Sequence, residues 1–151
     1  MPGSWSMRDL PYLTGDTCEV TSKASRQYNC IAWAAGENTD WWWPDPMGVG
    51  RWPASAPRVV SVDAFVQAYE TLGYKLCYDN SLETGLEKVA IFGKTNPADG
   101  SVIPTHAALQ LKSGEWTSKL GALEDICHKT LEAAEGPLYG KALYYMSRPR
   151  S

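Results

Sequence analysis

The chain has 151 residues, of which 44% are hydrophobic and 21% are charged, and its formal net charge is −3. This length and composition are typical of one globular domain, so we expect a single domain over residues 1–151. The acidic balance and the scattered basic residues exclude a broad basic surface, and we therefore expect no nucleic-acid partner.

The N-terminal sequence MPGSWSMRDLPYL lacks the charged region and the apolar stretch of a secretory signal. No run approaches 18 apolar residues, so we expect no membrane contact. These features predict a cytoplasmic protein that would need a dedicated secretion system for export. The cysteines are widely spaced without a CxxC pair, which predicts reduced thiols and no zinc site.

Residues 1–27 show no sustained period and are predicted to be an irregular lead-in. The run CIAWAAGE, after Asn29, predicts a short helix that Gly36 ends. Residues 38–60 contain four Trp, four Pro and two Gly, which predicts a long ordered loop.

The clearest helical pattern is SVDAFVQAYETLGY, with Ser61 as N-cap and Gly73 as C-cap. Strands are predicted to begin at Lys75, Glu87, Thr105 and Glu115, and the last two are predicted to form a hairpin. The stretch ALEDICHKTLEAAEG predicts one or two helical turns, and YGKALYYMSR predicts a final strand. Helices followed by antiparallel strands are an α+β pattern.

Cys30 lies at the predicted start of the first helix. Free N–H groups and the helix dipole favour an anion there, so this position is suited to a thiolate nucleophile. The same N–H groups, with the side chain of Gln27 or Asn29, would form an oxyanion hole. The alternative is that Cys30 is a small core residue that packs the helix on the sheet, which is the interpretation we give to Cys18, Cys77 and Cys127.

His106 heads the predicted strand HAALQL, where small residues leave space beside its ring. As a general base it would need an acceptor on its far nitrogen. If the sequence KSGE closes the hairpin, the residue opposite His106 lies near Ser118 to Leu120, and Ser118 is the best single candidate, with Lys119 beside it and Thr117 on the other face. His106 and Ser118 would otherwise be an ordinary core histidine and an ordinary strand hydroxyl.

His128 and Asp125, in the segment EDICHKT, are alternatives for the third position of this site. The triplet Trp41, Trp42 and Trp43 would either line a substrate groove or seal the core from solvent. Because adjacent residues point in different directions, at least one of the three is expected to reach a cleft that begins at Cys30.

These pieces resemble the papain-like superfamily, in particular its NlpC-type peptidoglycan hydrolases. The strand pattern HVGIYLGNGKFIHA of that branch aligns without a gap with HAALQLKSGEWTSKL. The resemblance implies that Cys30 is the nucleophile, His106 the base and Ser118 the orienting residue, and Tyr28 is similar to a tyrosine that lines such sites. It also implies an α+β, NlpC-like fold with N-terminal helices packed on an antiparallel β-sheet.

Residues 28–148 also resemble a family of small bacterial proteins of unknown function. The shared pieces are NCIAWA, WWWP, FVQAYETLGY, EKVAIF, THAALQL, WTSKLG and a late YG. This second resemblance implies no activity.

The resulting hypothesis is a cysteine peptidase or amidase that acts through a thioester acyl-enzyme, with no metal and no organic cofactor. Its substrate would be a peptidoglycan stem peptide or a protein amide, and Trp41, Trp42, Trp43 and Lys119 would line the cleft. The alternative is a non-catalytic binding or immunity-type module that holds a protein partner in the same cleft and on the tryptophan-rich loop.

Overall fold

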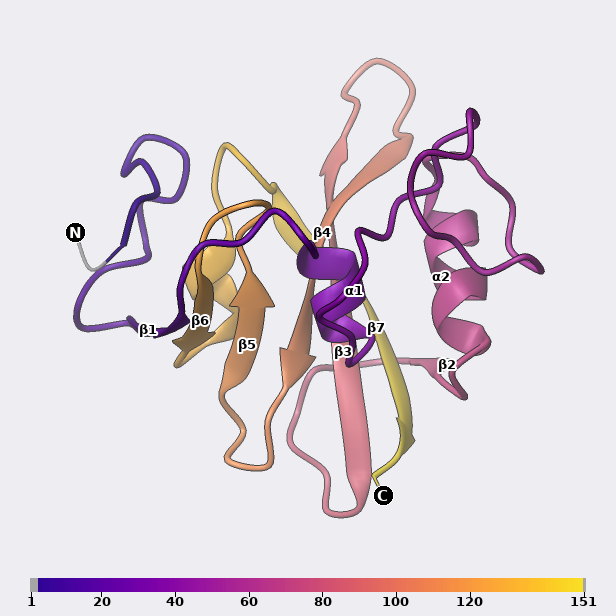
Figure 1. The fold of residues 1–151 in the computed structure, drawn as a ribbon. Coiled ribbons are helices and arrows are strands. Elements are labelled where there is room, and N and C mark those ends of the chain that lie inside the picture. Colours follow the sequence, from indigo (N-terminus) through magenta and orange to yellow (C-terminus); the bar gives the residue numbers. More distant parts are fainter. Residues whose placement is uncertain (1–2, 151) are drawn as a thin grey trace.

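The computed structural model describes residues 3–150, which are organised around one antiparallel seven-stranded sheet (Figure 1). Across the sheet the strands follow the order β1-β6-β5-β4-β3-β7-β2. In chain order the elements are β1 (Cys18–Ser22), α1 (Cys30–Ala34), α2 (Val62–Glu70), β2 (Lys75–Cys77), β3 (Leu86–Thr95), β4 (Val102–Gln110), β5 (Trp116–Lys119), β6 (Asp125–His128), the 3₁₀ helix η1 (Leu131–Ala134) and β7 (Lys141–Pro149).

The predicted fold class, an α+β papain-like domain with N-terminal helices packed on a sheet, is wrong. The sheet dominates the molecule, the two α-helices have only five and nine residues, and β1 precedes both of them. The error lies in two segments: Cys18–Ser22 falls in the predicted irregular lead-in, and Asp125–His128 falls in the predicted helical turns. These two segments pair with each other as β1 and β6. Each of these strands depends on hydrogen bonds to the other, which lies far away in the chain. The local sequence pattern therefore predicts neither of them.

Both α-helices begin at side-chain caps, Ser61 as predicted and Asn29 at the predicted start of the first helix. The Asn29 side chain accepts a hydrogen bond from the Ala32 N–H at 3.2 Å, and the Ser61 side chain accepts one from the Ala64 N–H at 3.1 Å. Each bond satisfies a donor that the first helical turn leaves free. The cap of α1 fixes Cys30 as the first residue of that helix.

The predicted hairpin is confirmed as β4 and β5. Leu109 pairs with Thr117 and Gln110 with Trp116, and the turn closes through a bond from the Leu111 N–H to the Glu115 carbonyl at 2.8 Å. Thr117 Oγ1 accepts a hydrogen bond from the Trp33 indole of α1 at 2.9 Å, so it points to the helix face of the sheet. Because strand side chains alternate, Ser118 points to the opposite face.

The core lies in two layers, one on each face of the sheet. Helices α1 and α2 cover one face, where Ile31, Phe65 and Ile91 pack together. On the other face Phe92 and Ile126 pack against the N-terminal segment and η1. Full burial of each such side chain contributes about 1.5 to 3 kcal/mol.

The loop at residues 38–60 is ordered against the helix face, as its tryptophan content predicts. Trp42 and Trp52 are each only 6% exposed. Trp43 meets the Phe65 ring edge-on at a centroid distance of 5.6 Å. The loop is therefore a fixed wall beside the start of α1 (Figure 1).

Candidate active site

Cys30 is buried at the start of α1, against β4. The N–H groups of Ala107, Ile31 and Cys30 itself favour the thiolate, but burial outweighs them and raises the pKa of the thiol to about 11. The expectation of a helix-start cysteine that is ionised at neutral pH is therefore wrong. A five-residue helix has only a small dipole. That dipole stabilises the thiolate less than the loss of water around the sulfur destabilises it.

His106 is fully buried in β4, between two aromatic rings. Its ring is stacked on Tyr139 at a centroid distance of 4.0 Å with 13° between the planes, and it meets Phe92 edge-on at 5.0 Å. Burial and the nearby His128 hold the pKa of His106 well below its usual value. The imidazole is therefore neutral at physiological pH.

Ser118 lies between two histidines. Its Oγ is 3.0 Å from Nε2 of His106 and 2.8 Å from Nε2 of His128. The second ring continues the chain, because Nδ1 of His128 is 2.8 Å from the Thr130 carbonyl oxygen. The structure thus brings together His106, Ser118 and the alternative third residue His128 in one row, which we call the imidazole relay.

The directions of the hydrogen bonds in this relay follow from one fixed acceptor. A carbonyl oxygen only accepts, so Nδ1 of neutral His128 carries the proton and Nε2 of that ring is an acceptor. Burial lowers the pKa of His128 to about 4, which keeps the ring neutral. Ser118 must therefore donate its single proton to His128 and accept from Nε2–H of His106. The remaining nitrogen of His106, Nδ1, is left unprotonated.

The relay leaves this Nδ1 atom buried without a hydrogen-bond partner. Gln110 Oε1 is the other such atom in residues 3–150. A buried acceptor without a partner is costly, and each one in a native structure calls for an explanation. Here it is an imidazole nitrogen with a free lone pair, held in the tautomer that a general base requires.

Cys30 and His106 both lie close to Ala107 of β4. The N–H of Ala107, the next residue after His106, acts directly on the Cys30 sulfur. The two side chains belong to different core layers, since Ala107 packs with Cys30 and Phe92 packs on the His106 side. Within residues 3–150 no hydrogen bond joins Cys30 to His106. The link between them is Tyr139, which stacks on His106 and lines a hollow together with Cys30.

This hollow, which we call the Cys30 hollow, has a volume of about 290 Å³. Its walls combine the start of α1, the tryptophan-rich loop, the beginning of β4 and the segments after β5 and η1. The lining residues are Asn29, Cys30, Trp41, Trp43, Thr105, Gly121 and Tyr139.

Asn29 clamps the tryptophan-rich loop to the start of α1. Its Oδ1 accepts from the N–H groups of Ala32 and Trp42, and its Nδ2 donates to the Trp42 carbonyl at 2.7 Å. This clamp uses one of the two Nδ2 hydrogens, so the oxyanion role that the sequence suggested for Asn29 stays a prediction. Its role in the fold is to hold Trp41 and Trp43 beside Cys30.

The predicted cleft residues separate into two groups. Trp41, which is 37% exposed, and half-buried Trp43 line the Cys30 hollow. Trp42 is buried and donates its indole N–H to Glu37, so it seals the core instead. Gln27 is exposed and is not part of the lining, which removes the support for its role in an oxyanion hole.

Lys119 is also not a cleft residue, because it is fully buried on the helix face. Its ammonium donates to the carbonyls of Ser25 at 2.7 Å and Gly121 at 2.5 Å and lies over the Tyr28 ring. The Tyr28 hydroxyl donates to the Asp125 carboxylate at 2.7 Å. Tyr28 and Asp125 therefore form a buried polar support beneath α1, and Asp125 does not join the imidazole relay.

Tyr139, Thr105 and Gly121 are site residues that the sequence reasoning missed. Tyr139 reaches the site on a tight loop closed by two hydrogen bonds between Gly136 and Gly140. A Cβ at Gly140 would collide with the Gly93 carbonyl, so only glycine allows this loop to lie against β3. The sequence PLYG contains no periodicity that would place its tyrosine on a histidine far away in the chain.

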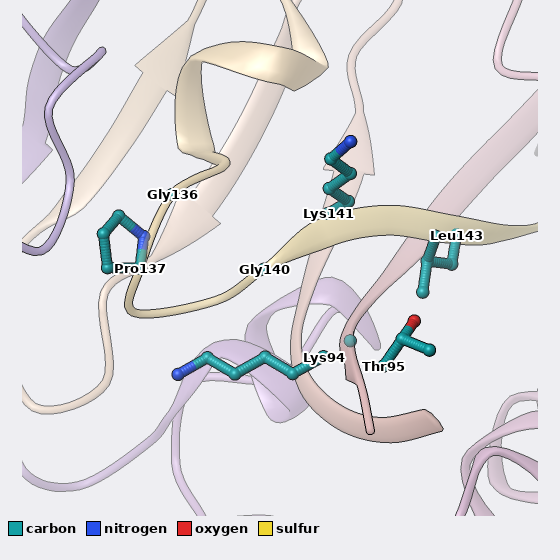
Figure 2. A pocket seen from close by; sticks show the side chains of 8 residues that line it. Lys94, Thr95, Gly136, Pro137, Gly140, Lys141 and Leu143 are labelled. Atoms are coloured by element: carbon teal, nitrogen blue, oxygen red, sulfur yellow. The ribbon is translucent and has the colours of Figure 1, made fainter. Parts of the chain in front are cut away.

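A second hollow of about 580 Å³ lies where β3 and β7 meet, away from Cys30 (Figure 2). Figure 2 shows Lys94 and Lys141 extending in different directions from its rim. Its remaining walls are backbone at three glycines together with Thr95, Pro137 and Leu143. Its polar groups do not converge on one point, whereas those of a ligand-binding site do.

The fold and the site together define a small sheet protein with a buried helix-start cysteine, Cys30, on one face of the sheet and a histidine–serine–histidine relay on the other. The sequence of residues 19–147 matches a family described as a domain of unknown function (DUF7689), and the chain belongs to that family. No curated protein and no solved structure matches the chain. Between residues 3 and 150, no helix is long and apolar enough to cross a membrane, and no three His, Cys, Asp or Glu side chains gather as metal ligands.

Proposed function

We propose that this protein is a cysteine-dependent amide hydrolase, with Cys30 as nucleophile and His106 as general base. The observation that carries the proposal is the free Nδ1 of His106, buried and held unprotonated by Ser118 and His128. A base of this kind contributes about 10²- to 10⁴-fold to an acyl transfer. The motif resemblance of Cys30, His106 and Ser118 to NlpC-type hydrolases supports the same chemistry, and nothing in the proposal rests on their fold.

The first step forms a bond between the Cys30 sulfur and the carbonyl carbon of the amide. In the proposed reaction the thiol proton passes to Nδ1 of His106, which requires that ring, in the other core layer of the structure, to come within hydrogen-bond reach of the Cys30 sulfur; Nδ1 then gives the proton to the departing amine as the C–N bond breaks. Water attacks the resulting thioester, its proton moves through Nδ1 to the Cys30 sulfur, and the acid is released. A pKa of about 11 for the resting thiol requires this proton transfer to accompany attack, because a thiolate is not present beforehand.

Burial and His128 oppose the cation that forms on His106 during this step, and the Ser118 oxygen and the Tyr139 ring are the groups that offset this cost. Its Nε2–H points at the Ser118 oxygen, whose own proton is directed to His128. The stacked ring of Tyr139 offers its negative face to the imidazolium. The N–H groups of Cys30 and Ile31 at the start of α1 supply the donors for the oxyanion.

The test compares wild type with Cys30→Ala on isolated peptidoglycan and on tryptic peptides of a bacterial proteome. Mass spectrometry should find hydrolysed amides that only wild type produces, and added hydroxylamine should trap the thioester as a hydroxamate. Cys77→Ala is the matched control, because Cys77 lies on β2 outside the Cys30 hollow and its loss should leave the products unchanged. Identical product lists for wild type and Cys30→Ala would contradict the proposal.

A binding module is the second candidate, and exposure in the tryptophan-rich loop favours it. Met47 and Val49 are 86% and 84% exposed. A partner protein that covers this loop would remove these two apolar side chains from water. In that case Met47→Asp would abolish binding of the partner protein, whereas Cys30→Ala would leave that binding intact.

A further inference from the structure

The walls of the Cys30 hollow select the kind of substrate that can reach the sulfur. Three aromatic side chains, Trp41, Trp43 and Tyr139, surround Cys30. A volume of about 290 Å³ matches one large side chain and is small for a longer ligand. Aromatic walls bind flat or bulky apolar groups through their faces and edges.

Two polar side chains at the hollow, those of Asn29 and Thr105, already have partners inside the protein. The Asn29 amide is bonded to Trp42 and Ala32, and Thr105 Oγ1 donates to the Tyr139 carbonyl at 2.5 Å. Such groups offer little to a polar substituent, which would lose its water without gaining a hydrogen bond. The remaining polar atoms are the Tyr139 hydroxyl and the indole N–H groups of Trp41 and Trp43, so a polar substituent finds few partners in the hollow.

Charged substituents are disfavoured for the same reason. The lining contains no Lys, Arg, Asp or Glu. Lys119 is near Cys30, but its ammonium is committed to the carbonyls of Ser25 and Gly121. A carboxylate placed in the hollow would be desolvated without a free cation to pair with.

The walls are also held in place before any ligand binds. Asn29 ties the Trp42 backbone to the start of α1, and Trp43 packs on Phe65. Tyr139 is fixed by its stack on His106. A pocket formed in advance binds its ligand without the cost of ordering a loop.

We propose that the Cys30 hollow takes an uncharged aromatic or large apolar side chain on the acyl side of the bond to be cleaved. This inference rests on the proposed function and narrows its substrate to peptides with such a residue. It disfavours peptidoglycan stem peptides, which are rich in carboxylates. Trp41 is the most exposed of the aromatic side chains that line the hollow. It is therefore the best site for a variant that leaves the core intact.

The experiment uses the p-nitrophenyl esters of N-acetyl-phenylalanine, N-acetyl-glutamate and acetic acid. Intact-mass spectrometry follows the acyl group on Cys30, and p-nitrophenolate release gives the rate. The phenylalanyl ester should acylate wild type about 10- to 100-fold faster than the glutamyl ester, the range that side-chain selection by an apolar pocket supplies. Trp41→Ala should slow the phenylalanyl ester about tenfold and change the acetyl ester little. Met47→Ala, an exposed position of the same loop outside the hollow, is the control.

A second measurement separates this inference from the proposed function. NMR titration of Cys30→Ala with N-acetyl-phenylalanine amide, against the glutamate amide, reports binding without chemistry. Equal acylation rates for the two esters would overturn the substrate class and leave the hydrolase proposal standing. Selective binding of the phenylalanine amide with no acylation of wild type by any ester would overturn the hydrolase and leave the pocket preference. Absence of both binding and acylation would overturn both.

Discussion

Nδ1 of His106 is free because Ser118 holds the opposite nitrogen of the same ring, with Oγ 3.0 Å from Nε2. Ser118 can accept at this bond only while its own proton is given to another acceptor. The tautomer of His106 therefore depends on His128, which makes no hydrogen bond to it within residues 3–150 and acts through Ser118.

Replacing His128 tests this dependence directly. In His128→Leu the Ser118 hydroxyl has no acceptor beyond it and turns to donate to Nε2 of His106, which moves the ring proton to Nδ1. In His128→Gln the amide oxygen still accepts from Ser118 and the native tautomer persists. Long-range ¹H–¹⁵N NMR of the His106 ring distinguishes the two tautomers.

The rate of Cys30 acylation in these variants should depend on which nitrogen of His106 carries the proton. We expect His128→Leu to lose about 10²-fold or more in acylation rate, the contribution of one positioned base, and His128→Gln to keep most of it. Loss of rate with an unchanged His106 tautomer would show that His128 acts only through the stability of the fold.

The buried histidines also predict how stability depends on pH. The pKa of His128 falls from 6.5 in the unfolded chain to about 4 in the folded protein. Between these values the unfolded chain binds more protons, so the free energy of unfolding rises with pH. The contribution of His128, about 3 kcal/mol, is present above pH 6.5 and is lost as the pH falls towards 4.

Urea denaturation at several pH values between 4 and 7.5 measures this loss. His128→Gln is the matched variant, because it fills a similar volume and does not titrate. Its unfolding free energy should change less across the window than that of wild type. Parallel pH profiles for the two proteins would contradict the prediction.

Asn29 is expected to support both the helix and the loop. Asn29→Ala removes two acceptor bonds and one donor bond, and we expect it to lower the unfolding free energy by about 2 to 4 kcal/mol. Asn29→Asp keeps both acceptor bonds and leaves only the Trp42 carbonyl without its donor, so its loss should be smaller. Urea midpoints followed by tryptophan fluorescence give the comparison.

Ser61→Ala controls for a simple cap, because the Ser61 side chain makes one bond, to Ala64, at the start of α2. We expect it to cost about 1 kcal/mol. Equal losses for Asn29→Ala and Ser61→Ala would mean that the clamp on the tryptophan-rich loop contributes nothing to stability.

The resting thiol of Cys30 should react slowly with small alkylating agents. With a pKa of about 11, only about one molecule in ten thousand carries the thiolate at pH 7, and the sulfur is buried. Peptide mapping after a short iodoacetamide pulse should show half-buried Cys77 labelled before Cys30. Labelling of Cys30 should rise about tenfold per pH unit until the thiol ionises. Preferential labelling of Cys30 at pH 7 would contradict the raised pKa.

Local patterns were sufficient to predict the elements that carry Cys30, His106 and Ser118. Asn29 and Ser61 are capping residues before apolar runs, and KSGE is a tight turn between alternating strands. These signals depend only on near neighbours in the chain, and they are enough to place Cys30 at a helix start and Ser118 on the same face of the sheet as His106. They failed for β1 and β6, whose pairing joins segments about a hundred residues apart.

The sequence by itself determined which side chains head each element, because caps, turns and strand alternation are local. Only the tertiary structure decided their chemistry. Burial raised the pKa of Cys30 against the local pull of its helix, because desolvation depends on everything packed around the sulfur. The pairing of β5 with β6 brought His128 to Ser118, and the loop closed by Gly136 and Gly140 brought Tyr139 to His106. These contacts join residues distant in the chain, and their geometry is set by the sheet.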